Sequence, residues 1–224
     1  MSDVSQYGRT VVVGRNSKVW NALSTSPHFD DITVCEIGHA QLEQFVFQPG
    51  DRVWIFAYSR SHAENLALFK KLSGHSSIDV AYISSASTNV TNITGCYTYP
   101  TAKLQAEDDV KRLCSARVVT IGLFYSALEE LPGGRTAATS LNELAMFMKF
   151  GNIKDKTVVN LFRMIDRPFR SEAERLVYNF YGKLMSAVGR FPCLLRPVDF
   201  LLRILNMRWY GYLYLSNRLW SSMI

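Results

Sequence analysis

The stretch Thr10-Val-Val-Val-Gly14 decides the fold class, because a short β-branched run that ends in glycine is typical of a buried strand followed by a turn. The segment 17–23 that follows predicts a first helix. Residues 51–57, Asp-Arg-Val-Trp-Ile-Phe-Ala, have the nearly continuous apolar character of a strand that is covered on both faces. Strand and helix patterns then alternate, which predicts an α/β fold with a parallel sheet.

The same patterns predict the remaining secondary structure. We expect strands at residues 31–36, 78–83, 117–124 and 158–162, and helices at residues 61–72, 100–113 and 144–149. The sequence Leu-Pro-Gly-Gly-Arg at 131–135 predicts a turn or loop. We therefore expect an α/β domain over residues 8–150 and a small helical extension, rich in aromatic residues and arginine, over residues 151–224.

The composition is that of a globular protein, with 224 residues of which 48% are hydrophobic. The formal net charge of +6 is compatible with nucleotides, acidic membrane surfaces or nucleic acid as partners, and it selects none of them. The four cysteines are widely spaced and the N-terminus has no signal-peptide pattern, so we expect reduced thiols and a cytoplasmic protein. Cys35 and His39 lack a second ligand pair, and no metal site is expected.

Tyr99 and Lys103 are the pair of residues that says most about chemistry. Residues four positions apart lie on the same face of a helix, and Pro100 suits a helix's first turn. A nearby cation favours the phenolate and lowers the pKa of a tyrosine from its usual value of about 10. Tyr99 is therefore a candidate proton donor or acceptor near neutral pH. The four-residue motif is common by chance, so its surroundings decide its value.

Gly14 stands between a strand and a helix, where a phosphate-binding loop belongs because free N–H groups at the helix start face the anion. Ser17 is small enough for close approach of a ligand to the backbone, and Arg15 and Lys18 add positive charge. The usual spacing of repeated glycines is absent, since Trp20 stands at the last position of the pattern. A plain strand-to-helix turn is the alternative interpretation.

Two other predicted strand ends carry polar side chains. Glu36 closes the second strand, where an acid would bind the ribose hydroxyls of a dinucleotide and favour NAD over NADP; a surface glutamate is the alternative. Arg15 and Lys18 favour NADP instead, so this choice stays open. The sequence Ser-Ser-Ala-Ser at 84–87 follows a buried strand, and hydroxyl groups there can hold a substrate carbonyl or alcohol beside the tyrosine.

Taken in this order, the features resemble the short-chain dehydrogenase/reductase superfamily, near its extended and atypical members, which include NAD-dependent sugar epimerases and dehydratases. The resemblance covers residues 8–150. It rests on the glycine loop, the acidic strand end, the D-x-V-x-x-x-A strand that ends at Ala57, the hydroxyl-rich strand end and the Y-x-x-x-K pair. It implies a Rossmann-like parallel sheet with helices on both faces, and NAD or NADP as the cofactor.

The resemblance also implies roles for individual residues. Tyr99 would be the catalytic acid/base, Lys103 would bind the nicotinamide ribose and lower the pKa of Tyr99, and Ser85 or Ser87 would orient the substrate. The residues that would contact the cofactor are Gly14, Arg15, Ser17, Lys18, Glu36, Ala57 and Lys103.

The chain departs from the family pattern in three ways. A single glycine, Gly14, is left of the glycine fingerprint. The serine position most usual in the family falls on Ala86, between two serines. The stretch between Glu36 and Asp51 is short, so we expect a strand and a helix of the standard fold to be reduced or absent.

The C-terminal segment 196–220 combines four arginines with many aromatic residues. Arg203, Arg208 and Arg218 interrupt every window that is long enough to cross a bilayer. Three interpretations stay open. In the first, the segment is a helical cap or a homodimer surface. In the second, residues 197–224 make peripheral contact with the inner membrane face. The third is nucleic-acid binding, which is disfavoured because no reader motif is recognisable.

Two hypotheses of different classes follow. The first is an NAD(P)-dependent oxidoreductase, epimerase or dehydratase that acts on a sugar nucleotide or another hydroxylated metabolite, with Tyr99 as acid/base. The second is a non-catalytic Rossmann module that serves as a scaffold or membrane-associated subunit in glycan assembly. The reduced glycine fingerprint and the basic aromatic tail favour the second hypothesis.

Overall fold

The computed structural model describes residues 9–30, 32–38, 41–57, 59, 61–155, 157–188, 191–205 and 211–223. The chain forms two compact units, each assembled from separate stretches. The first unit contains Met1–Ser84, Ala102–Thr120 and Leu141–Leu161, and the second contains Ser85–Thr101, Ile121–Ser140 and Phe162–Ile224. Because these stretches interleave along the chain, the units do not correspond one to one with the ranges 8–150 and 151–224.

A six-stranded sheet forms the centre of the first unit, with the strand order β2-β1-β3-β4-β5-β8. The strands are β1 (Thr10–Val13), β2 (Val34–Ile37), β3 (Arg52–Ile55), β4 (Asp79–Ser85), β5 (Arg117–Ile121) and β8 (Val158–Leu161). Strand β1 pairs in parallel with both β2 and β3, and β3 pairs in parallel with β4. The predicted α/β class with a parallel sheet is confirmed.

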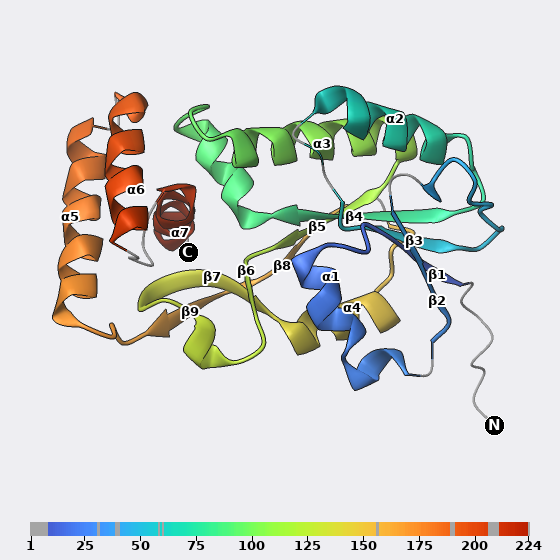
Figure 1. Ribbon diagram of the computed structural model, residues 1–224, viewed down its shortest axis with the longest axis horizontal. Coiled ribbons are helices and arrows are strands. Elements are labelled where there is room, and N and C mark those ends of the chain that lie inside the picture. Colours follow the sequence, from blue (N-terminus) through green and yellow to red (C-terminus); the bar gives the residue numbers. More distant parts are fainter. Residues whose placement is uncertain are drawn as a thin grey trace. The chain divides into compact units, whose positions relative to one another are not determined.

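Helices cover both faces of this sheet (Figure 1). They are α1 (Lys18–Ser24), α2 (His62–Ser73), α3 (Thr98–Cys114) and α4 (Leu141–Phe150), with a short 3-10 helix at Pro27–Phe29. Helices α2 and α3 lie on one face, and α1 and α4 lie on the other (Figure 1). Helix α2 begins where the sequence predicts, because the Ser61 side chain accepts a hydrogen bond from the backbone of Glu64.

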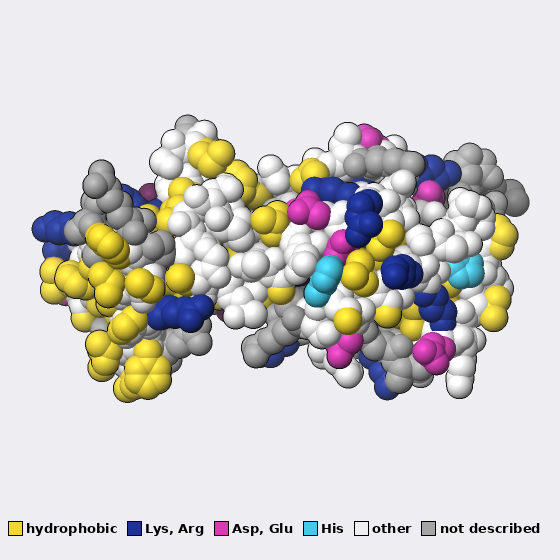
Figure 2. All heavy atoms as spheres, turned by 90° about the horizontal axis from the view of Figure 1, so that it is seen from above, with side chains coloured by type: hydrophobic (Ala, Val, Ile, Leu, Met, Phe, Trp, Pro, Cys, Tyr) yellow, Lys and Arg dark blue, Asp and Glu magenta, His cyan; other side chains and the backbone are white. Residues whose placement is uncertain are grey.

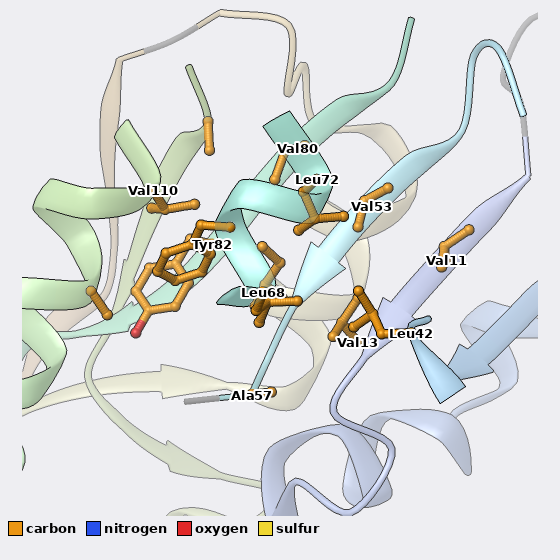
Figure 3. Packing of buried hydrophobic residues seen from close by; sticks show 14 of the residues in the cluster. Val11, Val13, Leu42, Val53, Ala57, Leu68, Leu72, Val80, Tyr82 and Val110 are labelled. Carbon is orange, nitrogen blue, oxygen red and sulfur yellow. The ribbon is translucent and has the colours of Figure 1, made fainter. Parts of the chain in front are cut away.

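Alternate residues of the central strands build the core on each face of the sheet. Val11, Val53 and Tyr82 point toward α2 and α3, and the cluster around them is shown in Figure 3. On the opposite face, the fully buried ring of Trp54 lies edge-on to Phe147 of α4, with 6.1 Å between the ring centroids. A strand with both faces buried has few polar positions, which explains the continuous apolar runs in the sequence.

The segment between β2 and β3 is reduced, as the short spacing in the sequence predicts. Among its described residues there is no strand, and β2 is the edge of the sheet. Leu42, Phe45 and Phe47 of this segment pack against the core cluster instead. These three side chains cover apolar surface that the missing strand and helix would otherwise cover.

The second unit has a three-stranded sheet and three helices. The sheet has the order β6-β7-β9 and consists of β6 (Leu123–Tyr125), β7 (Gly134–Ser140) and β9 (Arg163–Arg167). The helices are α5 (Glu172–Val188), α6 (Leu195–Ile204) and α7 (Gly211–Met223), with 3-10 helices at Ala86–Asn92, Leu128–Glu130 and Pro192–Leu194. Tyr181, Leu202 and Tyr214 bring the three helices together in one buried cluster.

The turn or loop predicted at residues 131–135 is confirmed for residues 131–133 and is wrong for the last two residues, because β7 begins at Gly134. Strand β9 has no counterpart among the predicted elements. The strand predicted at residues 117–124 is divided at Gly122 into β5 and β6. A Cβ atom on Gly122 would lie 2.3 Å from the carbonyl oxygen of Ala137, so glycine is needed for the close approach of β7.

Helix α7 is an integral part of the second unit. The Asn217 side chain accepts a hydrogen bond from the backbone N–H of Ala137 at 2.9 Å. The indole N–H of Trp220 and the hydroxyl of Ser216 both donate to the carbonyl oxygen of Ala86, at 3.0 and 2.9 Å. None of the described helices is both long and apolar enough to cross a bilayer. Of the arginines singled out in this region, Arg208 and the side chain of Arg203 lie outside the described residues.

Candidate functional site

The loop after β1 is shaped by Gly14. Its φ angle of +105° favours glycine, and a Cβ atom added there would lie 2.6 Å from the backbone nitrogen of Ala57. The backbone N–H groups of Phe56 and Ala57 both donate to the carbonyl oxygen of Val13, at 2.9 and 3.1 Å. The ends of β1 and β3 are therefore held against each other, and the glycine makes that approach possible.

A cavity of about 350 Å³ opens at this point. Its lining consists of Gly14, Arg15, Asn16, Ser17, Lys18, Gly38, Phe56 and Ala57. Strand β1 has β2 on one side and β3 on the other, so the chain reverses its direction of winding here. In open α/β sheets, ligands bind at the carboxyl ends of the strands at such a switch point. Five of the seven predicted cofactor residues come together in this lining.

The start of α1 supplies donors and positive charge to the cavity. Ser17 precedes the helix, and its side chain makes no capping hydrogen bond to the first amides in the described chain. The side chains of Arg15 and Lys18 are exposed at the cavity. Free amides and cations together can receive a phosphate group.

Trp20 does not obstruct the loop, although it replaces a glycine of the usual pattern. Its side chain is 1% exposed and packs between the rings of Phe29 and Phe56, with centroid distances of 5.5 and 5.7 Å. The indole fills the space between α1 and the sheet, where a glycine would allow the helix to pack more closely. The backbone of residues 14–18 stays open to the cavity.

Glu36 and Lys103 are the two predicted cofactor residues that, of those described, are not part of the cavity lining. Glu36 is exposed and pairs in register with Val12, so it lies before the end of β2. Ile37 closes this strand, and Gly38 takes the position beside Gly14.

Lys103 lies in a buried polar cluster at the end of β4. Its side chain donates a hydrogen bond to the carbonyl oxygen of Ile83 at 2.9 Å and lies 4.8 Å from the ring centroid of Tyr82. Burial lowers the pKa of Lys103 to about 7, against a smaller opposing effect of Glu107. The amine can therefore exchange a proton near neutral pH.

Glu107 and Ser84 complete this cluster; Ser84 was quoted only as part of the hydroxyl-rich stretch 84–87, and Glu107 was not predicted as a site residue. The Ser84 hydroxyl donates to the Glu107 carboxylate, and both side chains are buried. Burial raises the pKa of Glu107, although the hydrogen bond from Ser84 and the charge of Lys111 oppose the shift. The sequence does contain one indication of this cluster, because Lys103 and Glu107 are four residues apart in a predicted helix and therefore lie on the same helix face.

In the second unit, the predicted substrate-orienting serines lie together. The hydroxyl oxygens of Ser85 and Ser87 are 2.8 Å apart, and the backbone N–H of Ser87 donates to the Ser85 hydroxyl. Tyr99 is partly exposed and stacks on Tyr212, with ring centroids 5.2 Å apart and planes inclined by 24°. Helix α3 carries both Tyr99 and Lys103, four positions apart.

The described residues contain no group of three or more His, Cys, Asp or Glu side chains placed to hold a metal ion. Of the pair considered in the sequence, Cys35 is described and His39 lies outside the described residues.

Comparison with known proteins identifies the fold. No family model matches the sequence, and no curated protein matches it. A dTDP-4-dehydrorhamnose reductase from Bacillus anthracis, solved with NADP, has a TM-score of 0.53 at 12% identity, covering 82% of each chain. A UDP-N-acetylglucosamine 4-epimerase from Bacillus cereus has a TM-score of 0.51 at 10% identity, covering 75% of this chain and 90% of that one.

A third structure, MoeE5 in complex with UDP-glucose and NAD, has a TM-score of 0.50 at 13% identity and covers 70% of this chain and 78% of that one. The chain spans 48% of a nucleoside-diphosphate sugar epimerase from Corynebacterium glutamicum. At these identities the likeness concerns the fold. The Rossmann-like fold that the resemblance to short-chain dehydrogenases/reductases implied is therefore confirmed.

Proposed function

We propose that the protein binds NAD or NADP and acts as an oxidoreductase, epimerase or dehydratase on a sugar nucleotide or another hydroxylated metabolite. The observation that carries the proposal is the cavity at the switch point between β1 and β3. The lining of this cavity contains the start of α1, which has no side-chain cap, and the exposed cations Arg15 and Lys18. Backbone N–H groups and positive charges are what the diphosphate of a dinucleotide requires. The solved structures with NADP, or with UDP-glucose and NAD, support this ligand class.

The proposed chemistry uses α3. Tyr99 passes a proton to or from a substrate hydroxyl or carbonyl oxygen, and Ser85 and Ser87 orient that oxygen. Lys103 has a pKa of about 7 because it is buried, so the ammonium form that would support the Tyr99 phenolate is present up to about neutral pH and is lost above it. The nicotinamide, when bound, supplies or accepts the hydride.

The first test is a calorimetric titration of the protein with NAD(H) and NADP(H). We expect binding of at least one dinucleotide, and about tenfold weaker binding for Lys18→Ala, because a hydrogen bond to a charged group is lost. The matched control is Lys70→Ala, which removes one exposed lysine of α2 outside the cavity. The proposal fails if the wild type binds no dinucleotide, or if both variants weaken binding equally.

The second test separates catalysis from binding. With a panel of UDP- and dTDP-sugars, we expect Tyr99→Phe to abolish turnover while leaving dinucleotide affinity unchanged. Tyr212→Phe keeps a ring for Tyr99 to stack on and should retain turnover. Unchanged turnover in Tyr99→Phe would refute the role of the tyrosine.

A non-catalytic Rossmann module in glycan assembly is the second candidate. The single glycine of the loop favours it, and so does the hydrogen bond of Lys103 to the main chain at Ile83. Dinucleotide binding without turnover of any sugar nucleotide by the wild type would support this candidate over the enzyme.

A further inference from the structure

The outward side of helices α5 and α6 exposes large apolar side chains. Leu176 and Phe180 of α5 are 59% and 58% exposed, and Phe200, Leu201 and Ile204 of α6 are 66%, 57% and 65% exposed. We call these five residues the outer α5–α6 face. Figure 2 shows hydrophobic side chains gathered over the part of the second unit that contains α5 and α6, which Figure 1 labels. Contiguous exposed apolar patches of this kind mark interaction sites.

The exposure is unusual because the inward side of the same helices is already apolar. Tyr181 of α5 and Leu202 of α6 fill the buried cluster with Tyr214, and Val198 packs against it. A surface helix normally places polar residues opposite its buried stripe. Helix α6 instead repeats apolar residues at positions 200, 201 and 204 on the side turned to solvent.

The exposed acid of α5, Glu172, lies one turn before Leu176 and forms an ion pair with Arg175, so the other charges near this face are positive. The exposed side chain of Lys183 follows Phe180 by one helical turn, and Arg196, at the start of α6, is exposed and donates one hydrogen bond to the carbonyl oxygen of Cys96. Residues 177–224 contain six lysines and arginines and a single acid, Asp199. Asp199 is 5% exposed and accepts hydrogen bonds from Tyr181 and from the backbone of Gly211, so it offers no negative charge at the surface.

We propose that the outer α5–α6 face docks on an anionic lipid bilayer. The phenyl and aliphatic side chains enter the boundary between headgroups and acyl chains, and the cations meet the lipid phosphates. A second copy of the chain fits less well, because a two-fold contact would bring Lys183 and Arg196 of both copies together, while the exposed acid of α5, Glu172, is already paired with Arg175. Helix α7 is not the docking element, since its central residues 214–217 are buried.

The test is cosedimentation with vesicles of phosphatidylcholine alone and of equal parts phosphatidylcholine and phosphatidylglycerol. We expect the wild type to pellet with the anionic vesicles and weakly or not at all with the neutral ones. Phe200→Ser combined with Ile204→Ser should weaken binding at least about tenfold, because two apolar side chains no longer leave water. Lys183→Glu should weaken binding to anionic vesicles at least about fivefold.

The matched control combines Val46→Ser with Phe150→Ser, two exposed apolar residues of the first unit, and should bind as the wild type does. Light scattering of each protein measures its oligomeric state. The proposal is overturned if the wild type does not pellet with anionic vesicles, or if the Phe200/Ile204 variant and Lys183→Glu both bind as the wild type does. It is also overturned if the wild type is a dimer that binds no vesicles and the Phe200/Ile204 variant is a monomer.

Discussion

Gly14 and Gly50 both have positive φ angles, of +105° and +84°, but they differ in the space around them. A Cβ atom at Gly14 would lie 2.6 Å from the nitrogen of Ala57, whereas nothing lies within 4 Å of one at Gly50. We expect each substitution by alanine to lower the free energy of unfolding by about 1–3 kcal/mol through backbone strain. Gly14→Ala should cost more than Gly50→Ala and should also weaken dinucleotide binding. Urea denaturation and calorimetry measure the two effects, and equal losses at both positions would contradict the prediction.

Lys103 gives the protein a dependence of stability on pH. Burial lowers its pKa from 10.5 to about 7 in the folded state. Between these values the unfolded chain holds a proton that the folded chain has released, so the free energy of unfolding contributed by this residue rises with pH. Below pH 7 both states hold the proton, and the contribution is constant at its least favourable value.

We expect Lys103→Met to flatten the rise in unfolding free energy between pH 7 and pH 9, a slope of at most about 1.4 kcal/mol per pH unit in the wild type. Lys70→Met, which removes an exposed lysine, should keep the wild-type slope. Denaturation in urea at a series of pH values measures both. A variant at position 103 with an unchanged slope would show that another group is responsible.

The three C-terminal helices are joined by a hydrogen-bonded carboxylate. Asp199 of α6 accepts from the Tyr181 hydroxyl of α5 and from the backbone N–H of Gly211, where α7 begins. Asp199→Ala should lower the free energy of unfolding by about 1–3 kcal/mol, because buried donors lose their acceptor. Asp166→Ala, at an exposed position of β9, should change it by at most about 0.5 kcal/mol.

A double-mutant cycle with Tyr181→Phe identifies the source of the Asp199 effect. If the two side chains act as a pair, the double variant should be less destabilised than the sum of the single variants, by about 0.5–3 kcal/mol. Strictly additive losses, measured by urea denaturation, would contradict the pairing.

Helices and buried parallel strands could be predicted because their signals are local. Helix α2 has a serine cap and periodic leucines, and β3 has a continuous apolar run. Strand β7 was missed because its buried positions are small residues, such as Ala137 and Ala138, without the alternation that marks a strand. Its burial and its hydrogen bond to Asn217 come from helix α7, 80 residues later, and no local pattern can report them.

The residues of the candidate site likewise fall into those that local sequence signals predict and those whose position depends on tertiary contacts. The loop from Gly14 to Lys18 was predictable, because strand, glycine and helix follow one another directly in the sequence. Gly38 was not predicted, because its place in the cavity depends on the pairing of Val13 with Ile37 in neighbouring strands. The buried contacts of Lys103 depend on β4, whose position beside α3 is a tertiary property.

At the scale of the whole molecule, the interleaved units impose an order on folding during synthesis. The last stretch assigned to the first unit ends at Leu161, so its sheet can close once that residue has left the ribosome. The second unit must wait, because Ala86 is bonded by Trp220, 134 residues later. Strands β6, β7 and β9 can pair once Arg167 has been made, but the contacts of Ala86 and Ala137 with α7 form only after that last helix has been made. Residues 85–101 and 121–140 therefore wait longest for their final contacts, at a stage when every residue that lines the cavity beside Gly14 has already been made.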